Sequence, residues 1–104
     1  MGHNPKNFVY VIQVNDYTDE DEEHYLLPES FLSRVEARKC LAAEAHWWLD
    51  HHKRLTVDYG DLDESDDETV LADKAEPNYF VKIEILELEL YNTFNEAEGI
   101  NPNS

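Results

Sequence analysis

The sequence predicts an α+β fold in which a three- or four-stranded antiparallel sheet packs one long helix against one face. Two segments, FVYVIQV (8–14) and YFVKIEILELELY (79–91), have the β-branched and aromatic composition of strands. Between them, SRVEARKCLAAEAHWWLDHHKR (33–54) has the apolar spacing of a helix. A chain of 104 residues is long enough for one domain with a modest core. We expect that domain to cover residues 1–94 and the Asn-rich residues 95–104 to be a disordered tail.

The first strand and its hairpin come from the N-terminal third. FVYVIQV is apolar almost without interruption, which is typical of a central strand buried on both faces. Six acids then follow from Asp16 to Glu23 with no apolar period, so we expect a long charged connection. YLLPESFL (25–32) reads as a second strand broken at Pro28, because proline has no N–H for a ladder and belongs at an edge or a bend.

The helix has the clearest local signal. Ser33 followed by Glu36 is a capping-box spacing, and we expect a helix from Arg34 to about Arg54. Adjacent tryptophans lie about 100° apart on a helix, so Trp48 is assigned to the core and Trp47 to its flank. Trp47 either covers a loop or sheet edge or is an exposed anchor for a partner. The predicted core stripe consists of Val35, Leu41, Ala42, Ala45, Trp48, Leu49 and His52.

Basic residues are concentrated in this helix, which holds five of the eight Lys and Arg. Lys53 and Arg54 suit its C-terminal end through the helix dipole. Arg34, Arg38 and Lys39 lie near the other end and gain nothing from the dipole. We therefore expect these three to neutralise nearby acidic loops.

The last third contains two weak strand signals and one strong one. LTVDYG (55–60) reads as a short strand or a turn, and TVLAD (69–73), after the acidic stretch 58–68, can add a few residues of pairing. In the strong segment, Val81 and Ile83 alternate with charged residues, but Leu86 and Leu88 continue on the opposite parity. We favour a β-bulge near Ile85 and Leu86, and the alternative is a strand apolar on both sides. With a bulge, Lys82, Glu84, Glu87 and Glu89 would all face solvent.

The charge excludes several functions. With 24 acids against 8 bases, the formal charge of -16 would repel nucleic acid and anionic membranes, so direct binding to either is not expected. One cysteine, Cys40, allows no intrachain disulfide. The start, MGHNPKNF, lacks the pattern of a signal peptide, and no apolar run approaches the roughly 20 residues of a membrane span. We expect a cytoplasmic protein.

No motif predicts catalysis or a cofactor. His46, His51 and His52 are spaced by five and six, whereas two metal ligands on one helical face need three or four. The acidic stretches lack the glycine and glutamate of an EF-hand, which leaves only loose cation binding by clustered carboxylates. Cys40 and His46 are too far apart on a helix for a nucleophile and base pair. We expect a protein that is not an enzyme, with no cofactor and no specific metal site.

The acidity itself then becomes the functional signal, because a negative surface binds basic partners. Alternate carboxylates on a strand stand about 6.6 to 6.8 Å apart. This is close to twice the rise of about 3.4 Å per phosphate in one DNA strand. The expected partner-binding residues form three acidic patches and one aromatic position: Asp61, Asp63, Glu64, Asp66, Asp67 and Glu68; Asp19, Glu20, Asp21, Glu22 and Glu23; Glu84, Glu87 and Glu89; and Trp47.

The acidic segments YTDEDEE, DYGDLDESDDE and EILELEL fall in one small domain. With these features the chain resembles, in size and charge, small acidic inhibitors that phages direct against restriction or CRISPR systems. Some of those proteins imitate DNA. The resemblance implies a non-enzymatic protein that blocks the basic nucleic-acid-binding surface of a larger complex. The strand and helix order around FLSRVEA is also similar to small uncharacterised bacterial α+β domains. The alternative is an interaction domain whose acidity serves solubility and whose contacts are aromatic or made by an edge strand. The oligomeric state is left open.

Overall fold

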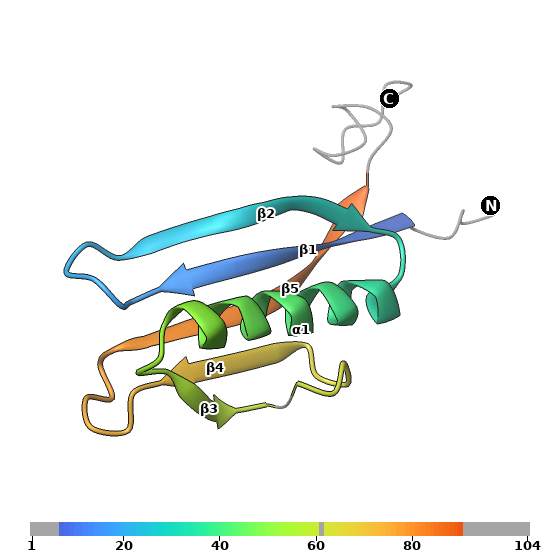
Figure 1. The fold of residues 1–104 in the computed structure, drawn as a ribbon. Coiled ribbons are helices and arrows are strands. Elements are labelled where there is room, and N and C mark those ends of the chain that lie inside the picture. The colour runs from blue at the N-terminus through green and yellow to red at the C-terminus, as the bar shows by residue number, and fades with distance from the viewer. Residues whose placement is uncertain (1–6, 61, 91–104) are drawn as a thin grey trace, which may run out of the picture.

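The computed structural model describes residues 7–60 and 62–90. They form one antiparallel five-stranded sheet in the order β2-β1-β5-β4-β3, with one helix across one face (Figure 1). The elements are β1 (Asn7–Asp16), β2 (Glu23–Phe31), α1 (Arg34–His51), β3 (Thr56–Tyr59), β4 (Glu68–Ala72) and β5 (Phe80–Leu90). The α+β class is confirmed, but the predicted three or four strands are wrong. The two segments with weak strand signals form β3 and β4, which pair with each other, and β4 also pairs with β5, so the sheet has five strands. The whole predicted tail, residues 95–104, and its boundary at 94 lie outside the described residues.

Helix α1 connects the two edges of the sheet, since β2 and β3 are the outermost strands. It begins at Arg34 because the Ser33 hydroxyl accepts the Glu36 backbone N–H at 3.4 Å. It ends at His51, three residues before the predicted limit, and the His52 N–H bonds to the Trp48 carbonyl. Within the described ranges no helix is long and apolar enough to cross a membrane.

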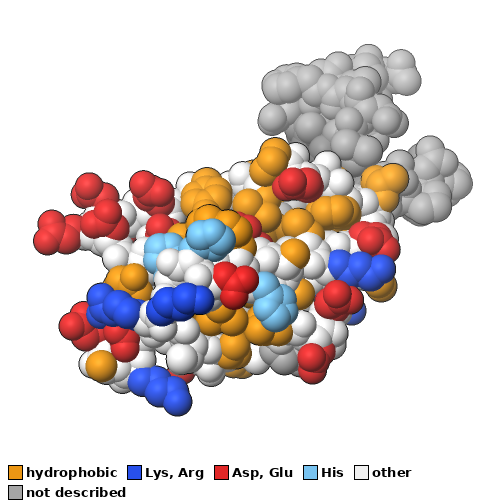
Figure 2. Space-filling view, in the orientation of Figure 1, with side chains coloured by type: hydrophobic (Ala, Val, Ile, Leu, Met, Phe, Trp, Pro, Cys, Tyr) orange, Lys and Arg blue, Asp and Glu red, His pale blue; other side chains and the backbone are white. Residues whose placement is uncertain are grey.

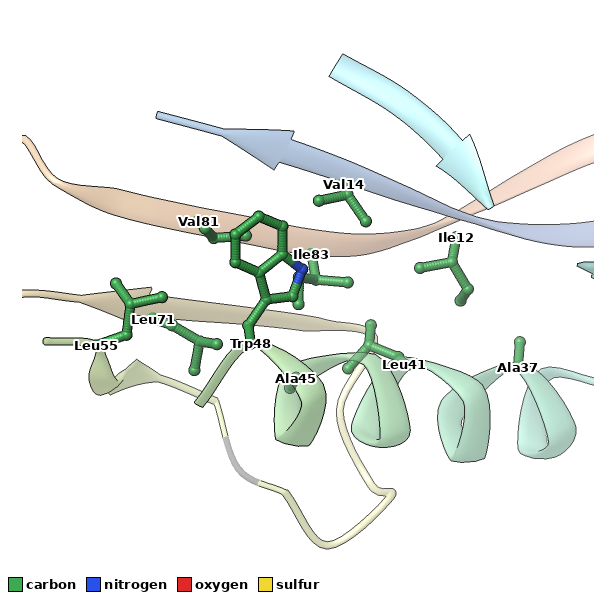
Figure 3. Close-up of a cluster of buried hydrophobic side chains, with 10 residues drawn as sticks. All are labelled: Ile12, Val14, Ala37, Leu41, Ala45, Trp48, Leu55, Leu71, Val81 and Ile83. Atoms are coloured by element: carbon green, nitrogen blue, oxygen red, sulfur yellow. The ribbon is translucent and has the colours of Figure 1, made fainter. Parts of the chain in front are cut away.

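The core lies between α1 and the covered face of the sheet (Figure 3). Trp48 is 4% exposed and Trp47 is 46% exposed, so the assignment of the two tryptophans is confirmed. Val35 is 56% exposed, and its place in the predicted stripe is wrong because the buried positions start at Ala37. The clustered side chains are Ile12, Val14, Ala37, Leu41, Ala45, Trp48, Leu55, Leu71, Val81 and Ile83.

Strand β5 is the middle strand, and its register with β1 is unbroken from Asn7↔Leu90 to Asp16↔Val81. The predicted bulge near Ile85 and Leu86 is therefore wrong. Residues opposite each other in an antiparallel pair share a face. Ile83 and Ile85 lie opposite Val14 and Ile12 on the covered face.

The later leucines of β5 belong to the other face of the sheet, which α1 does not cover and which we call the open face. Leu86 and Leu88 lie there, opposite Val11 and Val9 of β1. The apolar residues of β5 thus switch from odd to even positions along the strand. Those in its first half pack on the covered face, and those in its second half lie on the open face. This outcome is closer to the alternative of a strand apolar on both sides.

Strand β2 is an edge strand, as Pro28 predicted. Its register with β1 shifts between the pairs Val11↔Ser30 and Gln13↔Leu26, and Pro28 lies within the shifted stretch. The missing N–H of the proline therefore falls where the ladder is already interrupted.

Candidate protein-binding surface

The acidic stretch 58–68 is fixed to the helix by two arginines. Arg34 Nη1 lies 2.5 Å from Asp67 Oδ2, and Arg38 Nε lies 2.7 Å from Asp67 Oδ1. The hydrogen bond from Arg38, followed by that from Arg34, lowers the pKa of Asp67 against the opposing effect of burial. The prediction that Arg34 and Arg38 neutralise an acidic loop is confirmed. Lys39 instead pairs with Glu36 one turn earlier on the helix, at 3.2 Å.

The other acids of this stretch are spread over a turn and a strand. Gly60, with φ +84°, leads the chain out of β3, and a Cβ there would lie 2.6 Å from the Glu68 carbonyl oxygen. Asp63 and Glu64 are exposed, whereas Asp66 is half-buried. Glu68 belongs to β4 and lies 3.9 Å from Lys82 Nζ. Asp61 lies outside the described residues. The described acids of this stretch therefore differ in exposure and in partners, and they do not form one exposed patch.

The third predicted patch divides between the two faces of the sheet. Glu84 lies on the open face, where its Oε2 is 3.2 Å from Lys82 Nζ, and this hydrogen bond raises the pKa of Lys82. Glu87 lies on the covered face and pairs with Arg34. Glu89 shares that face by the register of β5. The expectation that Glu84, Glu87 and Glu89 form one solvent-facing row depended on the bulge and is wrong.

The β1–β2 connection holds the largest run of exposed acids. Asp19, Glu20, Asp21, Glu22 and Glu23 are all exposed, and Figure 2 shows acidic side chains gathered over this end of the molecule. None of the Lys and Arg residues in the described ranges forms an ion pair with any of the five. Glu22 lies 3.6 Å from His24 Nε2. In the described part of the chain, this run is therefore the acidic patch that no Lys or Arg neutralises.

The base of the β1–β2 connection is held by aromatic packing and backbone bonds. The Tyr17 ring stacks on Phe80 at 4.4 Å, and the Tyr17 N–H donates to the Phe80 carbonyl at 2.9 Å. Asp16 Oδ1 accepts hydrogen bonds from the Thr18 N–H and hydroxyl. A hollow of about 330 Å³ separates the connection from the β4–β5 loop, which adds the exposed Glu76 to this end. The acids thus project from an ordered base.

Trp47 is the exposed aromatic that the sequence singled out. Its ring stacks on His51 at 4.2 Å and meets Trp48 edge-on at 5.3 Å. His51 Nδ1 lies 2.8 Å from the Trp47 carbonyl oxygen. Trp47 therefore belongs to an ordered aromatic group, with nearly half of its surface available to a partner.

Sequence reasoning missed an electrostatic repulsion between two carboxylates, Glu29 of β2 and Glu44 of α1. Burial raises the pKa of Glu44, and the nearby Glu29 raises it further. The pKa of the half-buried Cys40 thiol is also raised, by burial and then by Glu29 and Glu44, which disfavours the reactive thiolate. The helical pattern gave no signal for this, because it placed Glu44 away from the core stripe, whereas the structure half-buries it. In the described part of the chain, no three His, Cys, Asp or Glu residues are arranged to hold a metal ion.

The described residues define an acidic α+β protein in which the helix covers one face of the sheet and an acidic connection lies at one end. No protein-family model, curated protein or solved structure matches the chain. Its function is therefore argued from this surface.

Proposed function

We propose that this protein is a non-enzymatic acidic binding protein that covers the basic nucleic-acid-binding surface of a larger protein. The single observation that carries the proposal is the run Asp19–Glu23, five exposed acids with no Lys or Arg partner in the described chain. Charges that the fold leaves unpaired remain available to a basic surface and repel one another until it binds. The resemblance in size and charge to small acidic phage inhibitors of restriction or CRISPR systems supports the same class of partner.

Comparison of the three acidic patches favours the β1–β2 connection as the contact. Asp67 and Glu87 already pair with arginines of α1. Releasing them for a partner would break ion pairs with α1, whereas the five acids of the connection have no pair with a Lys or Arg of the described residues to break. Asp63, Glu64 and Asp66 contribute to the same field at longer range. The proposal therefore ranks Asp19–Glu23 first and the 58–68 stretch second.

The test is a pull-down from nuclease-treated bacterial lysate at low and high salt, with mass spectrometry of the bound proteins. We expect a nucleic-acid enzyme at low salt that added DNA displaces and high salt releases, since screening shortens from about 10 Å at 0.1 M to about 3 Å at 1 M salt. The variant Asp19→Lys, Asp21→Lys, Glu22→Lys should abolish capture. A matched variant, Asp63→Lys, Glu64→Lys, Asp66→Lys, has the same change in charge and should weaken capture less. Equal loss from both variants would argue against a defined contact at the connection.

A second candidate function has its own observation, the half-exposed Trp47 stacked on His51. In this alternative the protein is an accessory interaction domain, and its acidity serves solubility. Exposed aromatic residues often dominate interface energy, and an interface built on them changes little with salt. Capture that survives high salt and is lost in Trp47→Ala would favour this alternative over electrostatic binding.

A further inference from the structure

A hollow of about 440 Å³ lies where β3, β4 and the β4–β5 loop meet. Its apolar lining consists of Val57, Val70, Ala72, Pro77 and Phe80. The pairs Ala72↔Phe80 and Val70↔Lys82 place Val70, Ala72 and Phe80 on the open face of the sheet. The volume falls within the range of about 300 to 1,000 Å³ that is typical of ligand sites.

Strand β3 borders this hollow and is an edge of the sheet. It pairs only with β4 among the described strands, and all four of its residues are exposed. Val57 is 40% exposed and Tyr59 is 61% exposed. An exposed edge offers backbone N–H and C=O groups to an extended chain, and neighbouring pockets then select its side chains.

The charges around the hollow indicate which chain would bind. Asp58 lines it and has no ion pair with a Lys or Arg of the described residues. Asp73 also lines it and pairs with Arg54 at 2.8 Å. Lys74 is the one basic side chain among the described lining residues. The formal charge of -16 disfavours a second copy of this chain, which would add the same charge again, and favours a basic occupant.

We propose that the hollow and the β3 edge form a docking site for an extended peptide segment in which an apolar side chain is flanked by Lys or Arg. The segment adds a strand beside β3, its apolar side chain enters the β3 side of the hollow beside Thr56, and a flanking base meets Asp58. This site shares the β4–β5 loop with the hollow beside Asp19 and Glu20, but none of the residues Asp19–Glu23 lines it. It goes beyond the proposed electrostatic function, because it requires an apolar anchor and not charge alone.

The experiment is an NMR titration of the isotope-labelled full chain with three synthetic hexapeptides. The first is acetyl-Thr-Lys-Leu-Lys-Thr-Lys-amide, the second has Glu in place of each Lys, and the third has Gly in place of Leu. We expect saturable shifts of the Val57, Val70, Ala72 and Phe80 amides with the first peptide at millimolar concentration. The other two should bind about fivefold more weakly or not at all, a difference of roughly 1 kcal/mol. Absence of these shifts overturns the proposal, as does equal binding of the Gly peptide.

Variants separate this site from the acidic connection. Thr56→Lys and Asp58→Lys are both at exposed positions that line the hollow, and each should weaken the first peptide by about fivefold. Val35→Lys places the same charge at an exposed apolar position of α1 and should leave binding unchanged. The triple reversal at Asp19, Asp21 and Glu22 acts on the basic peptide only through its longer-range field and should weaken it less than Asp58→Lys does. Loss in that variant alone would assign the peptide to the acidic connection and overturn the docking site without affecting the proposed function.

Discussion

Arg38 Nε donates a 2.7 Å hydrogen bond to Asp67 Oδ1, and this bond joins the first half of α1 to the residue that directly precedes β4. The Asp67 backbone carbonyl also accepts the Ile85 N–H at 2.8 Å. Asp67 therefore connects the helix, the acidic stretch and the middle strand through its side chain and its backbone. A residue from the most acidic part of the sequence thus has a structural role.

Asp67→Asn should lower the free energy of unfolding by about 0.5 to 1 kcal/mol near neutral pH, a small value because the pair is well exposed and screened by solvent. The pKa of Asp67 is lowered from 3.8 in the fold, so its contribution is present above that value and is lost as the pH falls through the folded pKa. Urea unfolding of both proteins at about pH 7 and about pH 2 measures this. Asp21→Asn, at an exposed acid without a Lys or Arg partner, is the control and should not destabilise.

Glu44→Gln should raise the free energy of unfolding at neutral pH by about 0.5 to 1 kcal/mol. The pKa of Glu44 is raised above 4.5 in the fold by burial and by Glu29, so the ionised form is disfavoured there. The penalty is present at pH values above the folded pKa and disappears as the pH falls below 4.5. Urea unfolding at neutral and acid pH should therefore show an advantage for Glu44→Gln that vanishes in acid. If Glu44→Gln were less stable than the wild type at neutral pH, the ionised Glu44 carboxylate would not be unfavourable in the fold, and this prediction would be wrong.

Local sequence signals predicted the helix start at Ser33, the edge position of Pro28 and the burial of Trp48, because each depends on neighbouring residues. Local sequence patterns failed for features that depend on residues far away in the sequence. Which side chains of β5 are buried depends on how far α1 extends over the sheet. The alternation of apolar residues within 80–90 holds no information about the position of α1. The same limit applies to the acidic patches, since pairing of Asp67 and Glu87 with Arg34 joins positions 33 and 53 residues apart.

The two faces of β5 can be tested with paired lysine substitutions. Ile83 is fully buried and Leu88 is 43% exposed on the opposite face. Ile83→Lys should destabilise by about 3 kcal/mol or more, because it buries an unpaired charge, and Leu88→Lys by about 1 kcal/mol or less. Chemical unfolding monitored by circular dichroism measures both. With the bulge that the sequence favoured, both residues would face the core and both variants would be severely destabilised.

The buried indole of Trp48 gives a test of the core, because its Nε1–H has no hydrogen-bond partner among the described residues. Trp48→Phe loses part of the packing but also removes a donor whose burial without a partner costs about 1 to 3 kcal/mol. We expect Trp48→Phe to destabilise by less than about 1.5 kcal/mol, whereas Trp48→Ala should cost about 3 to 5 kcal/mol. Trp47→Phe, at an exposed donor, serves as the control and should change little. If Trp48→Phe were as damaging as Trp48→Ala, the indole N–H would have to be satisfied in solution, most simply by a buried water molecule.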